Sequence, residues 1–515
     1  MPAFRLLRTG IVVAAIVATG ACAPQTNAPQ TNLPRTSAPQ GAVAALPKTK
    51  SVRTARQQRL GDENHPKILQ KYGGAYNNPR LAAYVTNLGR RIAAVSEQPA
   101  EKWTFTVLDT PQVNAFALPG GYIYLTRGLM ALANSEAEVA GVLGHEIGHV
   151  TAGHSSLRQN RTNIALGALL GAQILGSAVG LDPGLVQGIG QAGQIAAAGF
   201  LASHSREDEL AADNLGVRYL ARAGYDPYAQ AEFLESMGAS AALEAKLAGR
   251  TYDPNATGFF ASHPATGDRT RRAIEIAQTS GEVIPVGAAR NVDRYLAMID
   301  GLTFGDSPEQ GFVRGRDFLH PVLGFAYSSP SGFRVSNAPE SVTATGPDGA
   351  RFVLDGGGAA EVSLRRYMTQ TWMPLVAKAA KAGQMRGLRD LRINGLAAAE
   401  TTVPLEIKGK RYDALLVAIR MNDRIYRFTG LSPRGANRIV QYRQAAASFR
   451  RLGAAESAGL TAQRVDVARV RPGDTVRSLS RRMAVDELAE DRFRVLNGLK
   501  PGEQVRPGQV VKLIR

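Results

Sequence analysis

Residues 136–149 read EAEVAGVLGHEIGH, and the last five positions form the pattern HExxH. If this stretch is a helix, residues four apart are separated by about 40° around its axis, so His145 and His149 point the same way and can bind one metal ion. Glu146 lies about 100° away, beside the metal ion rather than on it. A carboxylate there can take a proton from an attacking water and pass it to the leaving amine. The stretch therefore predicts a helix that carries a metal-dependent hydrolytic site.

The residues around this pattern favour a buried helix. Ser135 and Glu138 have the spacing of a capping box at a helix start. The chain has only seven histidines, so two that flank a glutamate in this way are informative. The alternative is a surface helix that happens to contain two histidines. The apolar neighbours argue against it, because unpaired polar side chains are costly in a buried helix; they are Val139, Val142, Leu143, Ile147 and Val150.

A third metal ligand must come from elsewhere, because catalytic zinc usually has three protein ligands and one open position. The segment from residue 206 offers several carboxylates, namely Glu207, Asp208, Glu209 and Asp213. We favour Glu209, with Asp213 one turn later on the same face, where it can accept a hydrogen bond from a ligand histidine. The alternative is a solvated helix start, where carboxylates suit the helix dipole. Spacing alone leaves this choice open.

Four motifs together resemble the M48 metallopeptidases, a family that includes the CAAX-processing and HtpX-type enzymes and a periplasmic outer-membrane quality-control protease. They fall in order across 61–285, under half of the chain: NAFALPGG at 114–121, 136–149, SR with ELAAD at 205–213, and SHP at 262–264 followed by Arg269. The resemblance implies one Zn²⁺ per chain, with Glu209 as the third ligand beside His145 and His149. It also implies a mainly helical, gluzincin-type domain with a small sheet.

The same resemblance implies roles for three further residues. His263 is expected near the metal, where it stabilises the oxyanion or occupies the open position at rest; the alternative is a packed structural histidine. The edge strand that begins at Asn114 is expected to bind extended or unfolded polypeptide by strand addition. Arg269 is expected to contact substrate or to pair with an acidic residue. His154 is five residues past His149, about 140° round the helix, so we expect it to be structural.

The N-terminus predicts export. Arg5 and Arg8 precede an apolar run at 10–21, which has the order of a secretory signal and is short for a membrane span. Residues 19–22 resemble a bacterial lipobox, which makes Cys22, the only cysteine, the lipidated residue; ordinary signal cleavage is the alternative. Residues 23–60 are rich in Pro, Gln and Thr and predict a disordered linker. We expect a periplasmic protein that lipid on Cys22 anchors to the outer membrane.

The rest of the chain predicts an α+β protein with three folded domains, at 61–290, 291–460 and 461–515. Within the metallopeptidase domain, the Gly- and Ala-rich segment 163–201 predicts a helical pair over the active site rather than a membrane span. The domain at 291–460 mixes two helices with strand-like runs, at 351–354, 362–366 and 413–419 among others, and resembles the PsbP-like sandwich. Its role is left open.

Residues 461–515 resemble a LysM domain of βααβ plan. VRPGDTV at 470–476 is similar to the opening strand and turn of that family, and NGL at 497–499 with VRPGQV at 505–510 is similar to its second half. The resemblance implies peptidoglycan as a partner. The alternative is a degenerate copy that packs on its neighbour.

The charge and composition of the chain limit the classes of partner and function that we expect. The formal charge of +18 favours anionic partners, but nothing in the chain resembles a nucleic-acid module, so we expect the envelope surface rather than nucleic acid. The sequence thus predicts a zinc-dependent endopeptidase of the bacterial envelope that cleaves misfolded or unassembled envelope proteins. Two alternatives are a chaperone-like outer-membrane assembly factor with a gated zinc site and a peptidoglycan-associated cell-wall protein.

Overall fold

The computed structural model describes residues 54–154, 204–252, 263, 267–282, 287–359, 362–407 and 409–515. The predicted signal segment, Cys22, most of the linker and the predicted helical pair at 163–201 lie outside these residues. Helices and sheets are mixed along the described chain, which confirms the α+β class. Within these residues, no helix combines the length and apolar character needed to cross a bilayer.

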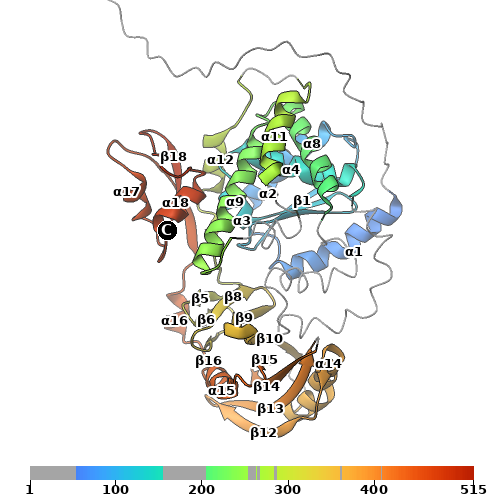
Figure 1. Cartoon of the computed structure of the whole chain (residues 1–515), viewed down its shortest axis with the longest axis vertical. Coiled ribbons are helices and arrows are strands. Elements are labelled where there is room, and N and C mark those ends of the chain that lie inside the picture. The colour runs from blue at the N-terminus through green and yellow to red at the C-terminus, as the bar shows by residue number, and fades with distance from the viewer. Residues whose placement is uncertain are drawn as a thin grey trace, which may run out of the picture. The chain divides into compact units, whose positions relative to one another are not determined.

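A small sheet and the helices around it form the first core (Figure 1). The strands are β1 (Thr104–Leu108), β2 (Ala115–Leu118) and β3 (Tyr122–Thr126). Their order is β1-β3-β2, with β3 parallel to β1 and antiparallel to β2, so β2 lies at an edge. The turn between β2 and β3 needs glycine, because Gly120 and Gly121 have φ values of 87° and 76°.

Among the described residues, the helices that accompany this sheet include α2 (Pro79–Ala94), α3 (Arg127–Leu132), α4 (Glu136–Thr151), α8 (Arg206–Arg222), α9 (Ala229–Leu247), α11 (Gly267–Thr279) and α12 (Val292–Ile299). Helix α4 carries the HExxH pattern, as predicted. Its capping box is only half formed: Ser135 Oγ accepts from the Glu138 amide at 3.1 Å, but the Glu138 carboxylate accepts from the Asn134 amide instead. Glu138 is itself buried, and the positive charge of the buried Lys512 lies near its carboxyl group.

Helices α4 and α8 approach each other closely through glycine. A Cβ atom added at Gly144 would lie 3.1 Å from the Gly216 Cα atom, and one added at Gly148 would lie 3.2 Å from the Ala212 carbonyl oxygen. Both distances are tighter than ordinary contacts of a Cβ atom, so a side chain at either position would require the two helices to shift by a few tenths of an ångström. The close approach brings the acidic residues of α8 against the histidines of α4.

Helix α1 (Ala55–Lys71) begins within the stretch that the sequence assigns to the linker. Thr54 and Gln57 form a capping box that starts this helix. Ile68 and Tyr72 then pack with Phe116 and other apolar residues of the first sheet. The last residues of the predicted linker therefore belong to the first turns of a capped, partly buried helix.

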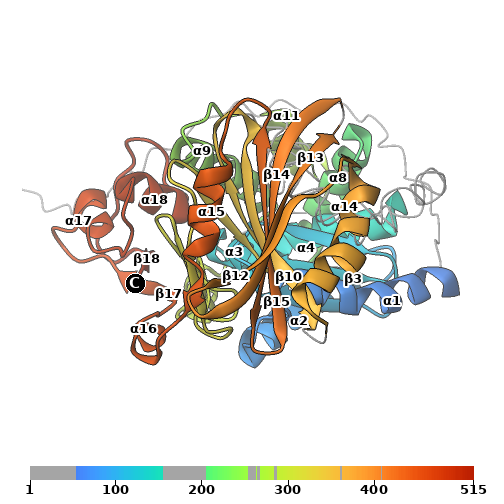
Figure 2. The ribbon, with the colours of Figure 1, turned by 90° about the horizontal axis from the view of Figure 1, so that it is seen from below.

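A second sheet occupies the middle of the chain. Its strand order is β11-β13-β14-β15-β10-β9-β8, with β12 also paired to β13. The helices α13 (Leu364–Tyr367) and α14 (Met373–Ala379) cover one face and α15 (Ile439–Ala447) covers the other, which Figure 2 shows. The strands are β8 (Arg334–Ala338), β9 (Ser341–Thr345), β10 (Arg351–Ala359), β11 (Lys381–Ala382), β12 (Arg386–Ile393), β13 (Leu396–Ile407), β14 (Lys410–Met421) and β15 (Arg424–Pro433).

Shorter strands complete this middle region. A four-stranded sheet has the order β16-β7-β6-β5, and it contains β5 (Phe312–Arg314), β6 (Asp317–His320), β7 (Phe325–Ser328) and β16 (Arg450–Arg451). The strand predicted at 362–366 is wrong. Ser363 caps a helix there, with its side chain accepting from the Arg366 amide at 3.3 Å.

The C-terminal residues run β17 (Gln463–Arg469), α17 (Val476–Ser480), α18 (Ala489–Leu496) and β18 (Val510–Ile514). β17 pairs with β18 and also with β4 (Thr303–Phe304), which directly follows the first core in sequence. Apolar residues of this C-terminal unit belong to the same hydrophobic core as α4 and the first sheet. The second sheet is thus inserted between two strands, β4 and β17, that pair with each other.

Candidate metal centre

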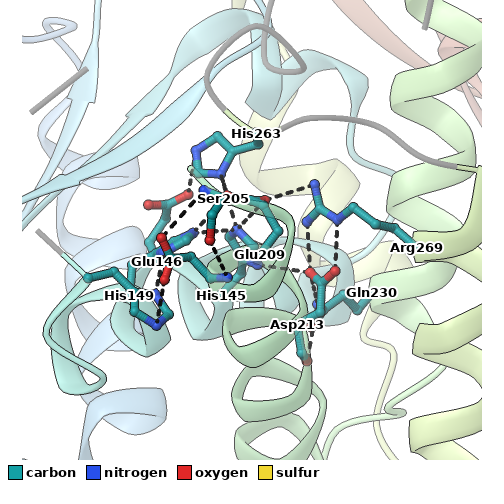
Figure 3. A network of polar contacts seen from close by, with 11 residues as sticks. His145, Glu146, His149, Ser205, Glu209, Asp213, Gln230, His263 and Arg269 are labelled. Atoms are coloured by element: carbon teal, nitrogen blue, oxygen red, sulfur yellow. Dashed lines mark hydrogen bonds and ion pairs between the residues drawn. The ribbon is translucent and has the colours of Figure 1, made fainter. Parts of the chain in front are cut away.

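Helices α4 and α8 bring together the three predicted zinc ligands (Figure 3). His145 Nε2 and His149 Nε2 lie 3.0 Å apart. Glu209 Oε1 lies 3.3 Å from His149 Nε2, and Glu209 Oε2 lies 3.5 Å from His145 Nε2. All three side chains are buried. Three metal-binding atoms from two helices therefore converge on one point in the protein interior.

This spacing fits a tetrahedral zinc ion. With zinc–ligand bonds of about 2.0–2.1 Å, tetrahedral geometry places the ligand atoms roughly 3.3 Å from one another. The distance from each histidine nitrogen to its nearer Glu209 oxygen, 3.3 or 3.5 Å, lies close to that value, and the two nitrogens are 3.0 Å apart. Two imidazole nitrogens and one carboxylate form a donor set of the kind that holds catalytic zinc. The residues present thus fit the predicted Zn²⁺.

His263 reaches the same point from ahead of α11. His263 Nδ1 lies 2.9 Å from Glu209 Oε1 and 3.3 Å from His145 Nε2. One ligand atom each from His145, His149, Glu209 and His263 lie within 4.8 Å of one another. His263 is therefore placed where a fourth ligand would stand, and its role stays a prediction.

Glu146 lies beside these ligands, as the helical spacing predicts. Its side chain is buried, and its Oε1 atom is 3.6 Å from His263 Nε2. Burial raises the pKa of the Glu146 carboxyl, because water no longer solvates the charged form. A cation bound at the neighbouring ligands would oppose this shift. The protonation state of the Glu146 carboxyl therefore depends on the groups around it. A general base needs a pKa that its surroundings can set in this way.

A buried ion-pair network lies behind His145. Asp213 Oδ1 is 2.9 Å from His145 Nδ1, and Gln230 Nε2 donates to the same oxygen at 3.0 Å. Arg269 donates to both Asp213 oxygens at 2.7 Å, and its Nη1 atom is 3.0 Å from Glu209 Oε2. Asp213 therefore lies where the sequence predicts it. The buried Arg269 pairs with two carboxylates, which favours the acidic-partner alternative over a substrate contact.

The two ligand histidines differ in charge behaviour: burial opposes protonation of His145, but the neighbouring Asp213 outweighs burial and raises the pKa of this imidazole. Burial lowers the pKa of His149 well below its usual value, so this imidazole is neutral, as a metal ligand must be. Burial opposes ionisation of Glu209 and Asp213, but neighbouring charges outweigh it. His263 holds the pKa of Glu209 well below its usual range, and Arg269 lowers the pKa of Asp213. Both carboxyl groups are therefore ionised.

Two histidines that the sequence did not assign to the site also contact His149. His154 Nδ1 lies 3.0 Å from His149 Nδ1. The His204 ring stacks on His149, with ring centroids 3.8 Å apart. The separation of about 140° expected for His154 assumed that the helix continues. Instead, Gly153 has a φ of 73° and turns the chain back toward α4. That glycine, just past the helix end, was the available signal.

Asn114 precedes the edge strand β2. Its backbone is held by Thr126: the Asn114 amide donates to Thr126 Oγ1, and the Asn114 carbonyl oxygen accepts from it, both at 3.0 Å. Its side-chain Oδ1 atom is buried and has no hydrogen-bond partner among the described residues. In the described part of the chain, β2 pairs only with β3. The outer edge of β2 thus fits the predicted strand addition.

Comparisons with known proteins agree with this geometry. Residues 79–277 match the model of peptidase family M48. A putative beta-barrel assembly-enhancing protease of Vibrio cholerae is 30% identical over 251 residues, which are 48% of this chain and 49% of that protein. Mitochondrial metalloendopeptidase OMA1 of Schizosaccharomyces pombe is 29% identical over 227 residues, 42% of this chain and 60% of that protein. The family match and these names support a metalloprotease.

The likeness is partial in length. The chain spans about half of the Vibrio cholerae relative, and its match to the beta-barrel assembly-enhancing protease of Escherichia coli, 30% identical over 190 residues, covers 35% of this chain and 37% of that protein. Among solved structures, cyanobacterial PsbP of Synechocystis is 10% identical, with 27% of this chain and 98% of that chain covered. Its TM-score of 0.24 is too low to support the predicted PsbP-like sandwich.

Proposed function

We propose that this protein is a zinc-dependent endopeptidase. The observation that carries the proposal is the convergence of His145, His149 and Glu209 at tetrahedral spacing, with Glu146 beside them. Zinc held by these residues would polarise the peptide carbonyl and acidify a water. Glu146 is placed to take a proton from that water and to deliver it to the amine nitrogen as the peptide bond breaks.

The proposed substrate is an extended or unfolded polypeptide. A backbone segment that pairs with the outer edge of β2 would run as an added strand, and main-chain hydrogen bonds would hold it without selecting a sequence. The relatives named beta-barrel assembly-enhancing proteases support a place in the bacterial envelope. We propose that this chain cleaves misfolded or unassembled envelope proteins there.

The test is zinc-dependent cleavage of an unfolded protein. Purified full-length protein should cleave reduced casein, stop when a chelator removes the metal, and recover when about one equivalent of zinc returns. Glu209→Ala should lose zinc to mild chelators, because two histidines alone hold it weakly. If the wild-type protein binds zinc but cleaves no unfolded substrate, while its loss still impairs outer-membrane assembly, the chaperone-like alternative replaces this proposal.

We further propose periplasmic localisation through a lipid on Cys22. The signal-like order of residues 1–22 supports it. Labelled fatty acid should appear on the wild-type protein and be absent from Cys22→Ser. Label retained by the variant, or never taken up by the wild type, would exclude lipid attachment at this residue.

Peptidoglycan is the proposed partner of the LysM-like C-terminal unit. The two VRPG turns support this proposal, and backbone hydrogen bonds join them, from the Gly508 amide to the Val470 carbonyl and from the Val470 amide to the Gln509 carbonyl, both at 2.8 Å. Full-length protein should sediment with purified peptidoglycan even at high salt. Binding that disappears in moderate salt would instead indicate a general attraction of exposed arginines to anions, because such contacts are screened.

A further inference from the structure

We propose that His154 is a positioning residue for the zinc ligand His149, whose Nδ1 hydrogen it accepts. This inference rests on the zinc site proposed above and assigns a role to a residue that neither the family resemblance nor the helical spacing singles out. His154 Nδ1 lies 3.0 Å from His149 Nδ1, on the side of the ring that faces away from the other ligands. Both side chains are buried.

The distance between these two nitrogens requires one proton between them. His149 presents Nε2 to the other ligands, so its Nδ1 atom carries the hydrogen and donates it. His154 Nδ1 must then accept, which places the hydrogen of His154 on Nε2. That nitrogen faces Asp208 Oδ1 at 3.6 Å. The Asp208 carboxylate is thus near the His154 Nε2 hydrogen at a distance longer than a hydrogen bond, and the 3.0 Å contact between His154 and His149 is the one that orients the ligand ring.

This arrangement differs from the one behind His145. There a buried carboxylate, Asp213, contacts the ligand directly and is neutralised by Arg269. Behind His149, a neutral imidazole makes the contact, and its carboxylate partner is partly exposed, with 27% of the Asp208 side chain accessible. A direct carboxylate at both histidines would add a further buried negative charge to those of Asp213 and Glu209, which is costly without a further cation. His154 orients the second ligand without that charge.

The fold brings His154 back to His149 through two local features. Helix α4 ends at Thr151, and the positive φ of Gly153 reverses the chain so that the next side chain returns to the helix it has just left. On the other side, a capping box fixes the first turn of α8: the Ser205 amide donates to Asp208 Oδ2 at 3.4 Å and so holds the Asp208 carboxylate near His154. The contact between His154 and Asp208 thus depends on how α4 ends and how α8 begins, and both of these features are defined by local hydrogen bonds or backbone conformation.

Two amide substitutions test this role. In His154→Asn, the side-chain amide occupies the place of Nδ1 and can still accept from His149. In His154→Gln, the amide lies one carbon farther, at the place of Nε2, and cannot. The readout is the zinc dissociation constant, measured by competition with a chromophoric chelator on full-length protein. We expect His154→Gln to bind zinc about 10–100-fold more weakly and His154→Asn to stay within about threefold of wild type.

A matched control and two further readouts separate positioning from general stability. His65→Gln removes a histidine that bonds to Tyr124 on the first sheet, 2.8 Å from its hydroxyl, and should leave zinc affinity unchanged. The unfolding temperature of the zinc-free protein should be similar for His154→Gln and His154→Asn. Cobalt in place of zinc should show altered visible absorption in His154→Gln alone, because the ligand ring is free to turn.

Equal zinc affinity in wild type and His154→Gln would overturn the positioning role while leaving the zinc site intact. An equal loss in His154→Asn and His154→Gln would also overturn it, since the acceptor at Nδ1 would then not matter. A wild-type protein that binds no zinc would instead refute the proposed function itself. The three results are distinguishable in one titration.

Discussion

At the scale of single residues, the two histidines of HExxH are held from behind by different groups. His145 is backed by an ionised carboxylate, and His149 by an imidazole. The nitrogens that face each other in front are nonetheless equivalent, 3.0 Å apart and equally close to Glu209 within a few tenths of an ångström. The two histidines therefore present equivalent nitrogens to a metal ion, although the protein groups that contact them from behind are different.

His263 is the residue whose change best reveals how the open position is used. Because its Nδ1 atom stands within 3.3 Å of two of the ligand side chains, we expect it to occupy the fourth position at rest. His263→Ala should then retain zinc and cleave casein faster, by at least about twofold, since more of the protein has an open site. Slower cleavage would indicate transition-state stabilisation instead, and an unchanged rate would leave a structural histidine.

At the scale of elements, α4 is fixed where it begins. Glu136, its first residue, is fully buried and accepts hydrogen bonds at 2.6–3.0 Å from Tyr84, Arg91, Tyr225 and Asn291. Burial alone would raise the pKa of the Glu136 carboxyl, but these donors outweigh it and lower the pKa to about 2. A carboxylate at a helix N-terminus also suits the helix dipole. The start of the metal-binding helix is thus tied to α2 and to the segments that precede α9 and α12.

The stabilisation from Glu136 should depend on pH in a defined direction. A carboxyl whose folded pKa is lowered stabilises the fold fully above its unfolded pKa, about 4.5, and loses that contribution as the pH falls toward 2. Glu136→Gln should lower the unfolding temperature of zinc-free protein at pH 7, equivalent to about 1–3 kcal/mol. The difference from wild type should shrink below pH 4.5. The exposed Glu275→Gln is the control, and a difference independent of pH would contradict the assignment.

The spacing of residues within one element predicted more of the site than contacts between elements did. His145, Glu146 and His149 follow from helical periodicity, and Asp213 follows from its position one turn after Glu209. Arg269 and His154 could not be placed in the same way. The partner of Arg269 depends on how α11 packs on α8, and the partner of His154 depends on a chain reversal at one glycine. Contacts between segments that are distant in the chain produce no periodic pattern in the sequence, so periodicity does not predict them.

At the scale of the whole molecule, the last strand supports the first core. Lys512, in β18, is fully buried, and its Nζ atom donates to the carbonyl oxygens of Ala131, Leu132 and Ala133 at 2.7–2.9 Å. These carbonyls end α3 just before α4 begins. Burial lowers the pKa of Lys512, and the neighbouring Glu138 carboxyl opposes that shift. The LysM-like motifs predict a separate domain at 461–515; in the structure, a buried lysine joins this unit to the metal-binding core.

Removing this cation should destabilise the peptidase core. Lys512→Met keeps the length and apolar stem of the side chain, but it leaves three carbonyl oxygens without their donor and removes the positive charge near the Glu138 carboxyl. We expect a loss of roughly 3–5 kcal/mol in the free energy of unfolding, measured by urea denaturation with zinc held constant. Lys500→Met is the matched control, because its ion pair with Glu235 is exposed and contributes about 1 kcal/mol or less. Equal effects of the two changes would show that β18 gives no special support.

In the proposed mechanism, one carboxylate performs the proton transfer while three other side chains hold the metal. Glu146→Gln tests it most directly, with zinc content and casein cleavage measured on the same preparation. We predict that the variant folds, retains about one zinc ion per chain, and loses cleavage by at least 10²–10⁴-fold, roughly the contribution of general-base catalysis. A Glu146→Gln protein that retains zinc and cleaves casein as fast as wild type would contradict the account.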